Sequence, residues 1–158
     1  IPSGNSMAVL DLLRLYHFSN RDEYLKRSED VLRAVSSVAR ENPFGFGQLL
    51  IAVYLYLRKP IEFTLVKGQE RGQGTFRKML DVVNGTYIPN GIFAFVEEGI
   101  NSNQLEKLPF FSGKLTLTDS EAYQSTRAYV CKGLACSQPM YTSDELENYI
   151  KSSNLSPE

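Results

Sequence analysis

The stretch IEFTLVKGQERGQGTFRKMLDVVNGTYIPNGIFAFVEEG, residues 61–99, decides the fold class. Its beginning, IEFTLVKG (61–68), is typical of a strand that ends in a glycine turn. GTFRKMLDVVNG (74–85) predicts a helix, which Gly85 is suited to end. The apolar positions of this helix lie on one face: Phe76, Met79, Leu80 and Val83. NGIFAFVEEG (90–99) is typical of a second strand, so the order strand, helix, strand indicates a parallel α/β unit.

The residues after this unit extend the same architecture. NSNQLEKLPFF (101–111) predicts a short helical or turn segment. GKLTLTD (113–119) and STRAYVCKG (125–133) are typical of further strands. YTSDELENYIKSS (141–153) predicts a closing helix, because Thr142 and Glu145 have the spacing of a capping box. The sequence from 60 to 158 therefore predicts a small α/β domain with a mixed sheet of three to five strands.

The residues before Pro60 predict three helices instead. NSMAVLDLLRLYHF (5–18) is apolar almost all round, and SNRDEYLKRSEDVLRAVSSVAREN (19–42) is amphipathic with the helical period. NPFGFGQLLIAVYLYLRK (42–59) has a proline suited to a first turn and is again apolar on several sides. The expected capping residues are Asn5 or Ser6 for the first helix, and Asn20 with Glu23 for the second.

The expected fold class is thus α/β of the mixed kind, with residues 1–59 as a helical segment and 60–158 as the α/β domain. The helices are more apolar than three helices alone need, which indicates part of a larger helical assembly. Because large apolar patches are unusual on monomers, we expect the isolated chain to self-associate. The sequence begins IPSGNS, without methionine or a charged leader, so we expect an excised fragment or a processed chain.

Composition excludes several function classes. The 158 residues are 42% hydrophobic and 22% charged, with a net charge of −1. No basic excess is present to neutralise phosphates, so we expect no nucleic-acid partner. No apolar run approaches the roughly 20 residues of a membrane span, so we expect no membrane association. Two cysteines are too few for a secreted disulfide scaffold, which favours the cytoplasm.

The two cysteines lie in AYVCKGLACSQP, residues 128–139. Gly133 suits a turn, and a hairpin there would bring Cys131 and Cys136 within reach of a disulfide. The spacing is not that of a CxxC redox motif, and two cysteines are not a complete zinc site, so we expect no metal and no other cofactor. Three interpretations remain: inert or structural thiols, a reversible disulfide, or half of a metal site shared with another chain or domain.

Other candidate residues have simpler interpretations. Gly68, Gly72 and Gly74 lie between a strand and a helix, where backbone amides can bind phosphate, but their spacing matches neither the dinucleotide nor the Walker pattern. An exposed turn is the simpler interpretation, and a phosphate-binding loop is the alternative. The single histidine, His17, is expected at a helix C-terminus, where its cation favours the helix dipole. Glu97 and Glu98 are expected to point to opposite faces of a strand and to be ordinary solvated charges.

Several short motifs, taken in order, resemble a known family. They are PSGNS (2–6), LLRL (12–15), YIPN (87–90), LPF (108–110), AYVCKGLACSQP (128–139) and DELENYI (144–150). Together they resemble the C-terminal part of the spermatogenesis-associated, thioredoxin-domain-containing protein family. The resemblance implies a thioredoxin-like N-terminal domain and a toroid of helical hairpins, similar to six-hairpin glycosidases and sugar 2-epimerases. Residues 1–59 would then be the end of that α/α toroid.

The start of the sequence, the apolar helices and the lack of a complete catalytic set predict the following function. The chain would be a non-catalytic accessory or interaction module, and its partners would be the thioredoxin-like domain and toroid of the parent protein. We expect no catalytic residues in this chain, because no complete catalytic set is present. One alternative is part of a carbohydrate-active, epimerase- or glycosidase-like toroid enzyme. Another is a thiol redox partner that acts through Cys131 and Cys136. Both alternatives rest on fold relatives.

Overall fold

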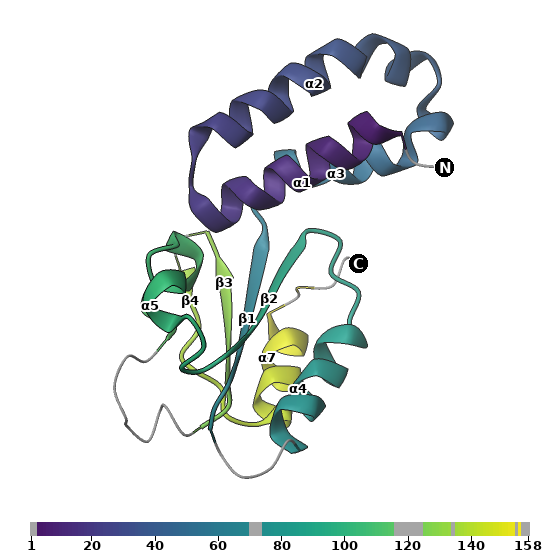
Figure 1. Ribbon diagram of the computed structural model, residues 1–158. Coiled ribbons are helices and arrows are strands. Elements are labelled where there is room, and N and C mark those ends of the chain that lie inside the picture. Colours follow the sequence, from purple (N-terminus) through teal and green to yellow (C-terminus); the bar gives the residue numbers. More distant parts are fainter. Residues whose placement is uncertain (1–2, 70–73, 116–124, 134, 154, 156–158) are drawn as a thin grey trace. The chain divides into compact units, whose positions relative to one another are not determined.

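The computed structural model describes residues 3–69, 74–115, 125–133, 135–153 and 155. Their helices and four-stranded mixed sheet confirm the predicted α/β class with N-terminal helices (Figure 1). The chain divides into two compact units. The helical unit comprises Ile1–Lys59 and Leu108–Phe110, and the α/β unit comprises Pro60–Lys107 and Phe111–Glu158.

The helical unit is built around α1. Its elements are α1 (Gly4–Ser19), α2 (Asp22–Glu41), the 3₁₀ turn η1 (Pro43–Phe46) and α3 (Gly47–Leu57). Helix α1 packs against both α2 and α3, which explains why it is apolar on more than one side. The buried core is Val9, Leu10, Leu13, Leu49, Ala52 and Leu55. The ring of Phe18 packs on Phe110 with 4.4 Å between centroids.

The helix boundaries correct two of the predicted caps. Ser3, and not Asn5 or Ser6, is the N-cap of α1, and its hydroxyl accepts a hydrogen bond from the Ser6 amide at 3.2 Å. Asn20 is the C-cap of α1 and not the N-cap of α2, because its φ of 53° is left-handed and its amide bonds the Tyr16 carbonyl. Asparagine tolerates this conformation better than most residues. The loop therefore ends one helix before it begins the next.

The α/β unit contains a sheet with the strand order β2-β1-β3-β4. The strands are β1 (Ile61–Lys67), β2 (Gly91–Glu97), β3 (Arg127–Lys132) and β4 (Ala135–Cys136). The helical elements are α4 (Gly74–Asn84), α5 (Ser102–Leu105), the 3₁₀ turn η2 (Pro109–Phe111), whose first two residues belong to the helical unit, and α7 (Ser143–Ser152). Strands β1 and β2 are parallel and joined through α4, as predicted, whereas β3 is antiparallel to β1.

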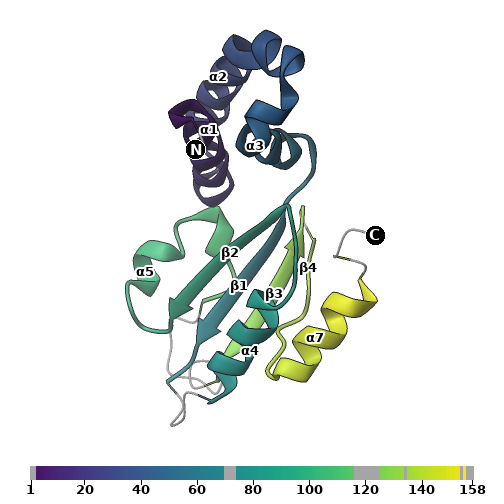
Figure 2. The same cartoon turned by 90° about the vertical axis from the view of Figure 1, so that its right-hand side faces the viewer.

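One face of the sheet carries the main core of this unit. Helices α4 and α7 lie side by side on that face, and α5 lies on the opposite side (Figure 2). Alternate strand residues point toward the two helices. The core formed there is Ile61, Phe63, Leu65, Met79, Val83, Ile88, Ala128, Val130, Met140, Leu146, Ile150 and Leu155. The other face of the sheet is consequently free to carry a different set of side chains.

Two further predictions concern the end of this unit. The predicted capping box of α7 is confirmed, because the Thr142 hydroxyl accepts from the Glu145 amide and the Glu145 carboxylate accepts from the Thr142 amide. In the predicted strand 113–119, residues 113–115 form a turn, and the rest lies outside the described residues. The segment after β4 follows the outer edge of β3, where Ala128 and Met140 exchange two backbone hydrogen bonds.

In the described part of the chain, no helix combines the length and apolar character that a membrane crossing requires.

Candidate functional site

The polar residues of interest lie on the sheet face that points away from α4 and α7. Because successive strand residues alternate between faces, the residues between the core positions of β1 and β3 share this second face. They are Glu62, Thr64, Arg127, Tyr129 and Cys131, and we call them the polar face of the sheet. Glu62 stands opposite Cys131, and Thr64 opposite Tyr129. The strand register thus gathers ionisable groups and a sulfur on one surface.

A disulfide between Cys131 and Cys136 closes the hairpin of β3 and β4. The two residues are directly opposed in the antiparallel pair, with 3.9 Å between their Cα atoms. Gly133 supplies the turn with a left-handed φ of 65°. Cys131 is 1% exposed, whereas Cys136 at the edge of the sheet is exposed. The disulfide therefore joins an exposed cysteine at the sheet edge to a buried one.

Lys114 covers the same part of the polar face. Its Nζ donates to the Thr64 hydroxyl at 3.3 Å and lies 3.9 Å from Oε2 of Glu62. The side chains of Lys114 and Glu62 are only 6% and 18% exposed. Burial lowers the pKa of Lys114 and raises the pKa of Glu62, and the attraction between the two groups partly opposes both shifts. Both groups therefore titrate closer to neutrality than exposed groups of their kind.

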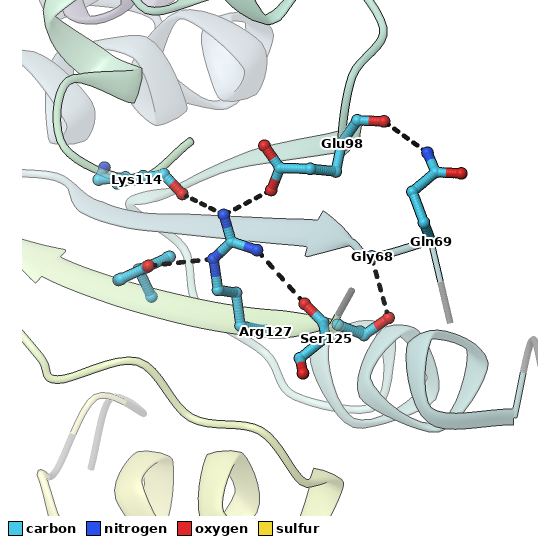
Figure 3. Close-up of polar contacts among 8 residues, drawn as sticks. Gly68, Gln69, Glu98, Lys114, Ser125 and Arg127 are labelled. Carbon is cyan, nitrogen blue, oxygen red and sulfur yellow. Dashed lines mark hydrogen bonds and ion pairs between the residues drawn. The ribbon is translucent and has the colours of Figure 1, made fainter. Parts of the chain in front are cut away.

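A second buried ion pair lies at the end of the sheet where β1 and β2 finish. Arg127 contacts Oε2 of Glu98 at 2.5 Å, and the two side chains are 1% and 0% exposed. The same guanidinium donates to the backbone carbonyls of Lys114 at 3.0 Å and Ser125 at 3.3 Å, as Figure 3 shows. Its Nε donates to the Tyr129 hydroxyl at 3.2 Å. Arg127 thus fixes the backbone that carries Lys114.

Sequence reasoning missed these buried charges. Glu97 and Glu98 do point to opposite faces, but only Glu97 is the partly solvated charge that was expected: its side chain is 41% exposed and pairs with Lys67 at 3.1 Å. Glu98 is fully buried, because Arg127 compensates its charge. The available signal was the alternation of polar residues at 62 and 64 and at 127 and 129 within apolar strands. This alternation does not indicate which residues cover the polar face.

Gly74, the last residue of the glycine-rich segment, borders a separate cavity between α4 and the ends of β1 and β2. This cavity is open to solvent and measures about 770 Å³. Its lining is Lys67, Gly74, Phe76, Arg77, Leu80, Phe95, Val96 and Glu97. Gly74 begins α4, Gly68 lies buried just after β1, and Gly72 lies outside the described residues. Both lining cations have carboxylate partners, since Lys67 pairs with Glu97, and Arg77 with Asp81 at 3.2 Å.

His17 lies in the helical unit and has a different character from the one expected. Its ring stands edge-on to Tyr16, with 5.2 Å between centroids. Burial lowers the pKa of His17, so the neutral imidazole is favoured at pH 7 and not the cation that the helix C-terminus suggested. Within the described ranges, no group of three or more histidine, cysteine, aspartate or glutamate side chains is placed to hold a metal ion.

Comparisons with known proteins point in one direction. The chain is 28% identical to human spermatogenesis-associated protein 20 over 149 residues, 94% of this chain and 18% of the relative. The mouse and rat proteins of the same name are 23% and 24% identical over the same length. No family model and no solved structure matches. The chain spans about 18% of the length of these relatives. Its similarity to a segment of spermatogenesis-associated protein 20, over nearly all its own length, confirms the family resemblance.

Proposed function

We propose that this chain is a non-catalytic interaction module, whose helical unit packs against further helices of a longer protein. The observation that carries this proposal is the surface of α3. One side of this helix is buried through Leu49, Ala52 and Leu55. The opposite side is also apolar but open: Leu50 is 46% exposed, Ile51 49%, Tyr54 39% and Leu57 71%. We call these four residues the exposed stripe of α3.

The exposed stripe favours a helical occupant. Its residues recur at the spacing that one apolar helix presents to another. The relatives are more than five times longer than the matched segment, so in them a long stretch of chain is available as a neighbour. We propose that this neighbour includes the end of a helical toroid, and that a thioredoxin-like domain belongs to the same protein. Carbohydrate chemistry would be a property of the longer protein, and none of the residue groups described above favours it.

An isolated chain should cover the exposed stripe with a second copy of itself. Light scattering at increasing concentration should therefore show masses above the 17.8 kDa of the monomer. The double variant Ile51→Glu/Leu57→Lys keeps the net charge and places two charges in the stripe, so its mass should fall toward the monomer. The control Ala34→Lys/Ser37→Glu, on an exposed side of α2, should behave like the wild type. A wild-type chain that stays monomeric at every concentration would argue against this proposal.

The nature of the occupant has its own test. The matched segment of human spermatogenesis-associated protein 20 can be produced alone and together with its flanking residues, and amide hydrogen exchange compared between the two. Amides of α3 should then be better protected, because the neighbouring helices reduce local opening. Unchanged protection of α3 in the longer protein would rule out those helices as the occupant. Protection that appears only at high concentration would assign the stripe to self-association instead.

The disulfide supports a second candidate function, thiol–disulfide exchange with a dithiol partner. We propose the cytoplasm as the compartment, where reductants keep ordinary thiols reduced. A partner thiolate would attack the Sγ of Cys136, the exposed residue of the pair, and the electron pair of the broken S–S bond would pass to Cys131. The second thiol of the partner would then release Cys136. In sum, the partner dithiol is oxidised to its disulfide, and the pair gains two electrons and two protons.

Two measurements check this candidate. In a glutathione titration read by mass spectrometry, oxidised and reduced pairs should both be populated between about −180 and −320 mV. The variant Cys131→Ser should form a mixed disulfide through Cys136, whereas Cys136→Ser should react slowly because Cys131 is buried. A pair that remains entirely disulfide, or entirely thiol, across that range would exclude exchange as a function.

A further inference from the structure

We propose that Glu62 is the proton donor and acceptor for Cys131 when the disulfide opens and closes, and that Lys114 positions it. This inference rests on the thiol–disulfide exchange proposed above. It assigns a role to Glu62 and Lys114, the buried pair on the polar face. The proposed interaction module gives this pair no role.

The strand register places the two groups together. Glu62 and Cys131 are directly opposite each other in the antiparallel pair of β1 and β3. Opposed residues point to the same face, with Cβ atoms about 4.5–5.5 Å apart. A glutamate side chain is long enough to bring its carboxyl group to a neighbouring sulfur from that position. This juxtaposition of Glu62 and Cys131 is set by the register of two central strands and does not depend on a loop.

The burial of Cys131 creates the need for a proton. When Cys136 is attacked, the electron pair of the broken bond leaves on the Sγ of Cys131, which is 1% exposed. A thiolate in such surroundings is unfavourable, because burial disfavours the charged form of a thiol. Water has little access to that sulfur. Glu62 stands opposite Cys131 in the register, and its side chain is 18% exposed, so it can exchange protons with solvent.

The surroundings of Glu62 suit a proton donor. Within the described residues, β2 presents the apolar Ile92 to it, and β3 presents Cys131, with Tyr129 two positions away. The segment after η2 contributes Lys114, whose Nζ lies 3.9 Å from Oε2 of Glu62. Burial raises the pKa of Glu62 above that of an ordinary glutamate, so it keeps its proton to higher pH than an exposed glutamate does. Arg127 is engaged with Glu98 and holds the backbone of Lys114 in place.

The complete step is balanced in atoms and charge. A thiolate of the dithiol reductant bonds to the Sγ of Cys136, the S–S bond breaks, and the electron pair goes to the Sγ of Cys131. The Glu62 carboxylic acid gives its proton to that sulfur and becomes a carboxylate beside the Lys114 ammonium, which stabilises the new charge. The second thiol of the reductant loses its proton to water and resolves the mixed disulfide, and the released Cys136 thiolate takes a proton from water. The Glu62 carboxylate then regains its proton from solvent.

The test is the rate of reduction by dithiothreitol between pH 5 and 8, divided by the thiolate fraction of the reagent. The wild-type rate should fall as Glu62 loses its proton. Glu62→Gln should be slower by about 100-fold at the acidic end, at the lower limit of general acid catalysis, and should lack this pH dependence. Glu62→Asp should restore part of the rate and part of its pH dependence. The matched control Glu97→Gln, on the opposite face of the neighbouring strand, should follow the wild type.

A further variant keeps the inference testable if Glu62→Gln does not fold. Removing the ammonium in Lys114→Met should raise the pKa of Glu62, so the fall in rate should move to higher pH. Wild-type protein that no dithiol reduces would overturn thiol exchange itself. Wild-type protein that is reduced, with Glu62→Gln matching its rate at every pH, would overturn the role of Glu62 and leave exchange standing. An unshifted profile in Lys114→Met would also count against that role.

Discussion

Replacing Arg127 with methionine should lower the free energy of unfolding of the α/β unit by about 3–5 kcal/mol. Arg127 and Glu98 are both fully buried, so removal of one leaves the other charge without its compensating partner. The variant also loses the hydrogen bonds to the carbonyls of Lys114 and Ser125. The loss of unfolding free energy can be measured by urea denaturation followed by far-ultraviolet circular dichroism. This method suits a chain without tryptophan.

Two further variants separate the charge from the packing. Arg127→Met/Glu98→Gln should recover part of the loss, because no unpaired ion then remains in the interior. Arg127→Lys keeps the charge but supplies fewer donors in a different geometry, so it should fall between the wild type and Arg127→Met. A loss below about 1 kcal/mol for Arg127→Met would contradict the burial of this pair.

Replacing Phe63 with alanine should cost about 3–5 kcal/mol, the range for a large aromatic side chain removed from a core. Phe63 is 0% exposed at the centre of β1, and its ring stacks on that of Phe93 with 5.2 Å between centroids. The same denaturation measurement applies. The control is Phe95→Ala on β2. Phe95 is 46% exposed and buries less of its ring, so its loss should cost less stability than the loss of Phe63. Equal losses of stability for the two variants would contradict the burial of Phe63 in the core beneath α4 and α7.

The strand–helix–strand unit could be predicted from the sequence because its signals are local. The apolar spacing in α4 and the alternation in β1 and β2 each lie within a dozen residues, and they report directly on the buried face. The capping box at Thr142 and Glu145 is equally local, and it was correct. Asn20 shows where local reasoning is ambiguous. Asparagine is suited both to begin a helix and to end one, and only the chain path decides between them.

The buried charges could not be predicted, because their partners are distant in sequence. Glu98 and Arg127 are 29 positions apart, and Lys114 meets Thr64 across 50. From the sequence alone, the charged members of these pairs, Glu98, Arg127 and Lys114, are each expected to be ordinary surface charges. The cysteines lie between these cases: their spacing permitted a hairpin, but the register that opposes them, and the glutamate that faces one of them, required the paired strands.

The outer edge of β3 has a consequence for how the sheet ends. An open strand edge presents unpaired amides and carbonyls that can template the addition of a strand from another molecule. Here β4 is short, and the segment that follows it continues the protection: Ser137 donates to the Val130 carbonyl at 2.8 Å, and Met140 exchanges bonds with Ala128. This irregular segment occupies the hydrogen-bonding groups without forming a regular strand. On this side, intermolecular sheet growth is blocked by backbone that belongs to the same fold.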